Sequence, residues 1–432
     1  MVQMSAEVKF LGAGQGKRGM GALIAYALSK ASVLIAPLLL SAVLPLSQYG
    51  LVELSLSVGQ LCAGLLAAGL PSSLSYLTLK RAQPRYLPAF YFHVIVTAVL
   101  CLVASVVAYF FDFVLFRAAA LVSGIVVSQF IASEKYRASG RAAASSLAES
   151  TLYLQVLIFG AAAYANWLPR TLPGLNFTLS CGLASILCWN AVAFRGMTSR
   201  AQLWRIYRVA LGYGIRTVPA SVATVGLSSF GRVLVGIVGS ASQVAIYSLV
   251  YRLCAPIVAI HQFLTNLFFT KLYTGQVKDF ERYFAALTVA LCLAGAMSVI
   301  VGPLLAYRLI GANALAIERQ PALFALMAMV MILWSQLSLM ELFMNREAKL
   351  LVQLPGLLAG CALALTPFVF RTWRGADQVA NVALFQGLGL ALGVAWQFRK
   401  SGHAAPVWRV PRALVLGEST VMVLVWLVIA LR

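Results

Sequence analysis

The chain has 432 residues, of which 61% are hydrophobic and only 10% are charged, and its mean hydropathy of +0.89 excludes a water-soluble globule. Its formal charge is +21, from 33 Lys and Arg against 12 Asp and Glu. A nucleic-acid-binding protein gathers its cations on one face of a soluble domain, whereas here they separate long apolar runs. The composition therefore predicts an all-α polytopic membrane protein.

Thirteen apolar stretches follow one another along the chain, each about as long as the ~20 residues that cross a hydrocarbon core. The first six are predicted at residues 19–44, 50–77, 87–110, 113–132, 143–164 and 174–194. The other seven are predicted at residues 209–238, 244–269, 284–309, 321–343, 350–370, 379–397 and 413–431. We expect twelve core transmembrane helices and one additional C-terminal helix.

The cysteines give no sign of redox or metal chemistry. All seven fall inside apolar runs, where Cys behaves as a small hydrophobic residue. We therefore expect no disulfide, no metal site and no cofactor.

The basic residues alternate between the predicted loops in the pattern that orients a membrane protein, because Lys and Arg favour the cytoplasmic side of short loops. With the N-terminus inside, 22 of the 33 basic residues lie in inner segments. The outer segments hold Arg170, Arg319, Arg371, Arg374 and Arg432. The sequence thus predicts a multi-pass protein of a bacterial inner membrane whose residues 1–18 form a cytoplasmic tail.

Six cations lie inside apolar spans, where a charge near the bilayer centre costs at least about 2.5 to 3.5 kcal/mol unless it is paired, faces water or snorkels. Lys30 and Arg252 lie too deep to snorkel easily, which favours a water-filled cavity. Arg232 is intermediate between the two interpretations. The other three lie near span ends, where snorkelling is the better explanation: Arg117, Arg216 and Arg308.

Few acidic residues are available to pair with these cations. Glu53 opens the second span, and Glu149 lies one to two turns into the fifth. Each is a candidate either for charge pairing with an intramembrane cation or for ion coupling. His261 is a third candidate for coupling, because histidine titrates near neutral pH, or it is hydrogen-bonded to a neighbour.

A short internal repeat indicates two similar units. The sequence SQYGLVEL at residues 47–54 follows the first span, and SQVAIYSL at residues 242–249 follows the seventh. Since six spans separate them, the units would be parallel and related by an axis along the membrane normal. The predicted parts are an N-terminal lobe at 19–195, a basic cytoplasmic linker at 196–208, a C-terminal lobe at 209–398, and a basic loop with the additional helix at 399–432.

Two groups of residues resemble a known family. LGYGIRTVPAS at 211–221, Phe230-Gly231-Arg232 and VAIYSLVYRL at 244–253 resemble the second-half signature of polysaccharide-biosynthesis flippases. These are the Wzx-like members of the multidrug/oligosaccharidyl-lipid/polysaccharide (MOP) exporter superfamily. Gln48-Tyr49-Gly50 with AGLPSS at 68–73 is similar to the matching first-half segment. Two features depart from the family: Gly231 replaces the usual acidic residue, and the thirteenth span lies beyond the core of twelve.

The resemblance implies a V-shaped pair of six-helix lobes that moves an undecaprenyl-pyrophosphate-linked oligosaccharide to the periplasmic leaflet by alternating access. A cationic central cavity suits this anion and repels the cationic drugs of multidrug exporters. The candidate substrate-binding residues are Lys30, Arg252, Arg232 and Arg216. The expected partners are the anionic lipid-linked oligosaccharide, membrane lipids, a polysaccharide polymerase and a chain-length regulator, with no nucleic acid.

Two other functions stay open. A multidrug-type or other small-solute exporter of the same superfamily has the same topology. A membrane glycosyltransferase or polymerase is less favoured, because the sequence has no acidic DxD-type pair, no large outer loop and no cluster that combines acid, base and metal ligand. We therefore expect a flippase for surface or exopolysaccharide biosynthesis that is not an enzyme.

The predicted orientation is testable by thiol labelling in intact cells. In a cysteine-free background, a single cysteine placed beside Arg346 should resist a membrane-impermeant thiol reagent, because this loop is predicted to be cytoplasmic. A single cysteine beside Pro173 should react. The reverse pattern of labelling would overturn the orientation.

Overall fold

The structure is a computed structural model that describes residues 15–80, 86–195, 199–310, 321–347, 349, 351–369, 378–401 and 409–430. Several residues of the predicted tail and loops lie outside the described residues: Lys9, Arg81, Arg85, Arg319, Arg371, Arg374 and Arg432. The described residues form helices joined by short turns.

The helices of the first half are α1 (Gln15–Val43), α2 (Leu46–Leu66), α3 (Leu70–Ser75), α4 (Leu87–Phe110), α5 (Val114–Ala138), α6 (Ala142–Glu149), α7 (Thr151–Tyr164) and α8 (Leu172–Phe194). A connecting helix, α9 (Arg200–Gly214), follows. The helices of the second half are α10 (Val218–Val238), α11 (Ala241–Thr274), α12 (Val277–Ile310), α14 (Pro321–Arg346), α15 (Leu354–Ala364), α16 (Thr366–Val369), α17 (Gln378–Lys400) and α18 (Arg409–Ala430).

The predicted all-α architecture of many apolar helices is confirmed. In the described part of the chain, ten helices are long and apolar enough to cross a membrane. The helices α6 and α7 form a further apolar pair, bent by 57° at the break between them. Two shorter apolar helices, Leu354–Val369 and Val415–Val425, fall where the eleventh and thirteenth spans were predicted. The protein is thus an all-α multi-pass membrane protein.

Two predicted spans were drawn too long. The second, predicted at 50–77, ends at Leu66, because Ala68 and Gly69 adopt positive φ angles of 50° and 66° that break the helix. The seventh begins at Val218 rather than at residue 209. Its predicted start belongs to α9, in which Leu203, Ile206 and Ala210 are buried on one face, whereas Arg205 and Arg208 are exposed.

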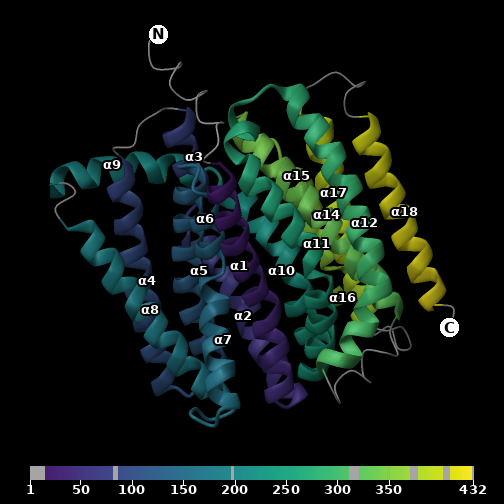
Figure 1. Cartoon of the computed structure of the whole chain (residues 1–432), viewed down its shortest axis with the longest axis horizontal. Coiled ribbons are helices and arrows are strands. Elements are labelled where there is room, and N and C mark those ends of the chain that lie inside the picture. Colours follow the sequence, from purple (N-terminus) through teal and green to yellow (C-terminus); the bar gives the residue numbers. More distant parts are fainter. Residues whose placement is uncertain are drawn as a thin grey trace.

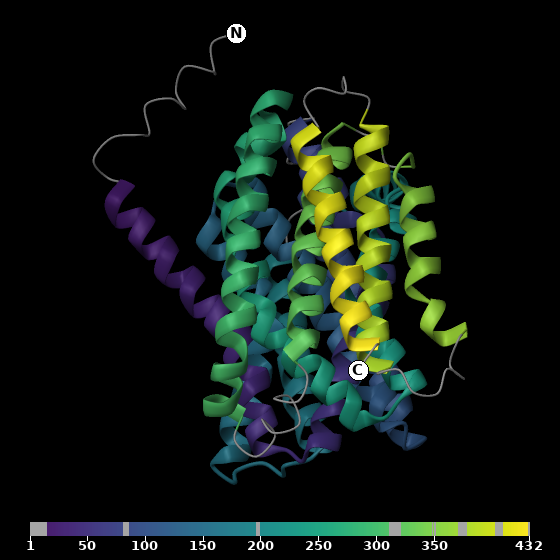
Figure 2. The same ribbon diagram turned by 90° about the vertical axis from the view of Figure 1, so that its right-hand side faces the viewer.

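The helices form two groups that lie side by side. Figure 1 shows α1 to α8, in purple to blue, on one side and α10 to α18, in teal to yellow, on the other, with α9 across one end of the first group. The groups meet where α2 packs against α10 and α11, and where α1 packs against α11. Figure 2 shows the beginning of α1 leaning away from the other helices.

Glycines allow close backbone contacts near both ends of α2, one with α11 of the second group and one with the connecting helix α9. A Cβ atom on Gly50 of α2 would lie 1.8 Å from the carbonyl oxygen of Ala241, at the start of α11. At the other end, a Cβ atom on Gly69 would lie 2.0 Å from the carbonyl oxygen of Gly214. Only glycine permits backbones to approach so closely. In this conformation these contacts therefore bring α2 close to the start of α11 and to the end of α9.

Substitution of Gly50 should destabilise the protein. Gly50→Val places carbon atoms inside the contact with Ala241, and overpacking of this kind costs about 1 to 3 kcal/mol. We expect a lower thermal unfolding midpoint in detergent. Gly212→Ala is the control, because nothing lies within 4 Å of its added Cβ. Equal midpoints for Gly50→Val and Gly212→Ala would contradict the close contact.

Candidate functional site

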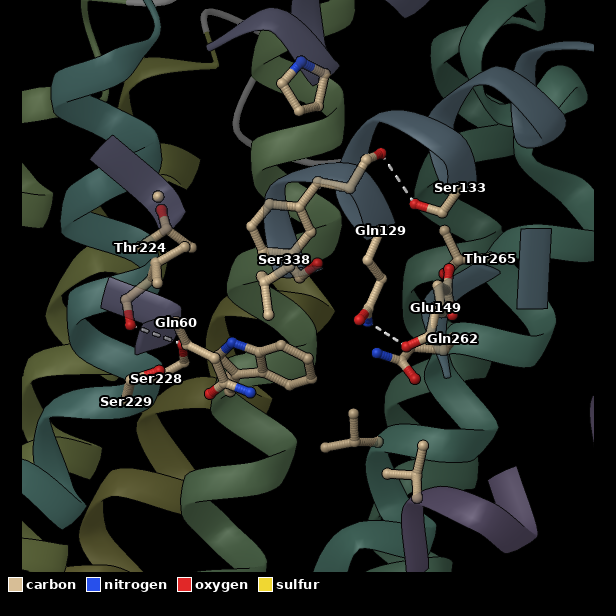
Figure 3. Close-up of a pocket in the computed structure, with 18 of the residues that line it drawn as sticks. Gln60, Gln129, Ser133, Glu149, Thr224, Ser228, Ser229, Gln262, Thr265 and Ser338 are labelled. Carbon is tan, nitrogen blue, oxygen red and sulfur yellow. Dashed lines mark hydrogen bonds between the residues drawn. The ribbon is translucent and has the colours of Figure 1, made fainter. Parts of the chain in front are cut away.

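A cavity of about 640 Å³ lies between the two groups of helices. Its walls come from α1, α2, α5 and the α6–α7 bend in the first half, and from α10, α11 and α14 in the second. Figure 3 shows side chains from both halves that point toward this space. Because each half supplies one wall, relative movement of the halves would change the shape of the cavity.

The cavity occupies one end of the helix bundle. On α2, α5 and α11 the lining residues start at Gln60, Val126 and Tyr251 and continue toward the C-terminal end of each helix. On α10 they lie nearer the N-terminal end and stop at Ser229. Since α10 runs antiparallel to the other three, all these positions lie in the half of the bundle where α1 begins (Figure 1). The predicted orientation makes this the cytoplasmic half.

Hydroxyl and amide groups make up much of the polar wall. They come from Gln60, Gln129, Ser133, Thr224, Ser228, Ser229, Gln262, Thr265 and Ser338, which Figure 3 labels. Aromatic rings lie between them, namely Phe130, Tyr153, Tyr251, Phe269 and Trp334. The cavity therefore presents hydrogen-bonding groups and flat apolar surfaces together.

One group of charges lies in the wall made by α1, α5 and α6. Lys30 Nζ lies 2.9 Å from Glu149 Oε2 and donates to Gln262 Oε1 at 2.6 Å. Arg137 Nη2 lies 2.5 Å from Glu149 Oε1, and Arg137 Nη1 lies 2.6 Å from Glu134 Oε1. Two cations and two carboxylates thus neutralise one another.

A second group of charges is buried where α2 meets α10 and α11. Glu53 Oε2 lies 2.9 Å from Arg232 Nη1 and 3.0 Å from Arg252 Nη2. Arg252 Nη1 also donates to the Tyr153 hydroxyl at 3.0 Å, and the Tyr49 hydroxyl donates to Glu53 Oε1 at 3.1 Å. The three charged side chains are at most 3% exposed. One carboxylate therefore serves two arginines, which leaves a local surplus of one positive charge.

This second group closes the deep end of the cavity. Arg252 and Tyr153 line the cavity, whereas Glu53 and Arg232 lie behind them and outside the lining. The same helices are in close contact beyond this point, at Gly50. The buried charges therefore stand between the cavity and the opposite end of the bundle.

The structure separates the residues that sequence analysis placed in one site. Lys30, Arg252 and Glu149 line the cavity. Arg232 is buried behind it, and Arg216 is exposed in the turn between α9 and α10 and does not line the cavity.

The structure also shows what surrounds the acidic and histidine candidates for ion coupling. Glu53 and Glu149 both pair with intramembrane cations, which is one of the two interpretations left open for them. His261 is buried, with the Thr265 hydroxyl 3.4 Å from its Nδ1 and its ring edge-on to that of Trp334. A role in ion coupling stays a prediction for all three.

The expected excess of positive charge is not present in the described lining. Three cations, Lys30, Arg137 and Arg252, are balanced by three carboxylates, which are Glu134, Glu149 and Glu341. Deep cations are visible in a sequence, but the carboxylates that pair with them come from other helices. The positive surplus is confined to the deep end, around Arg252.

Sequence analysis missed three charged residues of the lining. Glu134 and Arg137 were assigned to a loop, but α5 continues to Ala138, six residues beyond the predicted end. Their spacing of three residues on a helix was an available signal. Glu341 lies near the end of the predicted tenth span, at residues 321–343, where hydropathy alone gives it no role. It lines the cavity and has no ion-pair partner among the described residues.

Comparisons with known proteins agree on the fold. No family model matches this chain, and no curated protein matches it. The solved structure of the MATE multidrug transporter DinF-BH is similar, with 15% identity and a TM-score of 0.56 over 88% of this chain and 94% of that chain. A MATE protein in the straight conformation matches with 14% identity and a TM-score of 0.52 over 89% and 93% of the two chains.

A third similar structure is an inward-facing conformation of a multidrug resistance MATE family transporter of the MOP superfamily, with 15% identity and a TM-score of 0.52 over 88% and 98% of the two chains. Together these similarities show that the chain has a MATE-like fold, as the resemblance to the MOP superfamily implied. They leave the Wzx-like subtype as a prediction.

The buried charge group should be sensitive to loss of its carboxylate. Glu53→Gln leaves two buried arginines without a counter-charge, and breaking a buried pair in this way costs about 3 to 5 kcal/mol. Arg232→Gln should cost less, because Glu53 then pairs with Arg252 alone. Reversible unfolding in mixed micelles would measure both.

The control is Glu347→Gln, which removes a partly exposed carboxylate paired with Arg346 and should cost about 1 kcal/mol or less. If Glu53→Gln is no more destabilising than Glu347→Gln, the buried group does not hold the halves together.

Proposed function

We propose that this protein is an exporter that carries a lipid-linked oligosaccharide across the inner membrane by alternating access of its cavity. The MATE-like fold supports export, since its solved neighbours are described as transporters, one of them in an inward-facing conformation. The cavity in this chain lies in one half of the bundle and is closed at its deep end, as alternating access requires of one of its two states.

The composition of the cavity wall is the observation that favours an oligosaccharide as the substrate. An oligosaccharide offers many hydroxyl groups, and the wall offers hydroxyls and amides from five helices. Sugar rings also have apolar faces, which pack well on aromatic side chains such as Tyr251 and Trp334. A lipophilic drug would leave most of these polar groups without hydrogen bonds, and that loss is costly in a partly dehydrated site.

The position of the surplus charge fits the anionic end of such a substrate. Around Arg252 one carboxylate faces two arginines, so a pyrophosphate that reaches the deep end meets a net positive group. Lys30 reaches the same cavity from the opposite half, where it binds both Glu149 and Gln262. Anion binding here depends on local charge, since the lining as a whole is neutral.

A multidrug-type exporter is the second candidate, and one observation favours it. Glu341 is a carboxylate in the cavity wall without an ion-pair partner among the described residues, and a cationic solute would supply one. The solved neighbours described as multidrug transporters fit this candidate as well. The two functions therefore differ in whether Glu341 is needed.

Deletion and complementation would separate these functions. In a deletion strain we expect complete lipid-linked oligosaccharide to accumulate on the cytoplasmic side and surface polysaccharide to be lost. Wild-type protein should restore export, and Glu341→Gln should restore it to within about twofold, because the glycan needs no carboxylate there. Gln60→Leu, which removes a polar group from the same wall, should reduce export about tenfold, equivalent to ~1.4 kcal/mol.

Other outcomes would point elsewhere. Accumulation of a shorter, unfinished glycan would indicate a transferase. Unchanged polysaccharide together with increased sensitivity to cationic compounds, unrelieved by Glu341→Gln, would establish the multidrug-type exporter instead.

A further inference from the structure

A second cavity, of about 470 Å³, lies inside the first half of the molecule. It is enclosed by α4, α5, α7 and α8, and none of the helices of the second half contributes to it. Its residues on α4 come from the start of that helix, and those on α5 and α8 from their ends. The cavity is therefore at the same end of the bundle as the central one, near one surface of the membrane.

Helix α5 separates the two cavities. The central cavity takes Val126, Phe130, Ser133, Glu134 and Arg137 from this helix, at the spacing of one helical face. The side cavity takes Ser128, Ile131, Ala132, Lys135 and Tyr136, which form another face. Gln129 borders both. The side cavity is thus a distinct site with a wall in common with the first.

The cation of the side cavity has no counter-charge. Lys135 lies 2.5 Å from the Tyr91 hydroxyl, and its Nζ lies 4.9 Å from the centroid of the Tyr91 ring and 5.2 Å from that of Tyr136. No carboxylate among the described residues pairs with it. Arg137, two residues along the same helix, pairs with two carboxylates. A cation held in this way at a membrane surface is ready to bind an anion.

Besides Lys135, the side cavity is lined by amide side chains whose oxygen atoms lack a hydrogen-bond partner. Gln155 of α7 is only 9% exposed and lines the cavity, and its side-chain oxygen has no hydrogen-bond partner. The side-chain oxygen of Gln129 is likewise buried without a partner. Unpaired buried acceptors are costly, so a ligand that donates hydrogen bonds would relieve them. The rest of the lining combines apolar side chains, with Val94, Ile131 and Ile186 among them, and small polar ones such as Thr151 and Ser185.

We propose that the side cavity is a binding site for an anionic glycerophospholipid whose headgroup carries hydroxyls, such as phosphatidylglycerol. Lys135 binds the phosphate, and Gln155 accepts a hydrogen bond from a headgroup hydroxyl. The apolar walls hold the adjoining part of an acyl chain. Trp189, at the edge of the cavity and 74% exposed, lies where aromatic side chains meet the headgroup region of a bilayer.

A phospholipid fits this site better than the transported substrate does. The cavity holds about 470 Å³, less than the central one, and the side chains of Thr151, Ser185 and Asn190 already donate to backbone carbonyls nearby in the chain, which leaves fewer free groups for a chain of sugars. It also lies within one half, so movement of the two halves past each other would not carry its contents across the membrane. Gln129 donates to the backbone carbonyl of Glu149, so an occupied site contacts the wall of the central cavity.

Binding can be measured on the purified full-length protein by native mass spectrometry, with added phosphatidylglycerol, phosphatidylcholine or polyprenyl phosphate as separate probes. Wild-type protein should bind phosphatidylglycerol more tightly than phosphatidylcholine. Lys135→Gln should weaken phosphatidylglycerol binding about fivefold and remove this preference. Ser185→Phe, which fills the cavity from α8, should abolish binding of this lipid at the site.

Two control variants match these substitutions. Lys271→Gln removes an exposed lysine at the same end of the bundle, and Ala184→Phe adds the same ring on the outward side of α8, beside Ser185 but outside the cavity. Both should bind phosphatidylglycerol as wild type does.

Three results would overturn the proposal. One is wild-type binding of phosphatidylglycerol by both Lys135→Gln and Ser185→Phe. Another is equal affinity of the wild-type protein for the two phospholipids. The third is tighter binding of polyprenyl phosphate that both substitutions remove, which would assign the site to a prenyl lipid.

Discussion

The arrangement of the two halves depends on one buried carboxylate. Glu53 lies on α2 of the first half, and both of its cationic partners, Arg232 and Arg252, lie on helices of the second. Moving such charges from water into a protein interior costs several kcal/mol for each ion, and only close, well-oriented pairing offsets that cost. The three side chains must therefore stay together while they are buried. This requirement fixes the contact of α2 with α10 and α11, and the cavity is the space left on one side of it.

The same requirement shapes any change of state. To open the deep end, α2 must move away from α10 and α11, and the three charges must then be hydrated or find other partners. An anion that arrives at Arg252 offers such a partner, because it supplies the negative charge that one carboxylate facing two arginines lacks. A substrate can shift a conformational equilibrium only by its difference in affinity for the two states. The surplus positive charge around Arg252 can produce such a difference in affinity for an anionic substrate.

The sequence predicted the membrane spans and the deep cations well, because both are local features. It predicted the ion-pair partners of those cations poorly, because the partners come from distant helices. Hydropathy is a local property, so every predicted apolar stretch overlaps at least one helix. Lys30 and Arg252 stood out because a lone cation in an apolar run is costly. The residues that pair with them, Glu149 and Glu53, are 119 and 199 positions away, and no local pattern connects them. The break at Gly69 was missed because the residues beyond it continue the apolar run in a second helix.

Helix α5 shows how one amphipathic pattern can serve two environments. Hydropathy indicates only an apolar span ending near residue 132, and it does not reveal the two cavity-lining faces of this helix. One face holds Arg137 between two carboxylates and borders the central cavity, whereas the other holds Lys135 without a carboxylate and borders the side cavity. A charge that is neutralised inside the protein contributes little attraction to ligands, and a charge left unpaired at the same depth contributes much. Since the two cations share one helix, a shift of α5 that changes the pairing of Arg137 would also move Lys135.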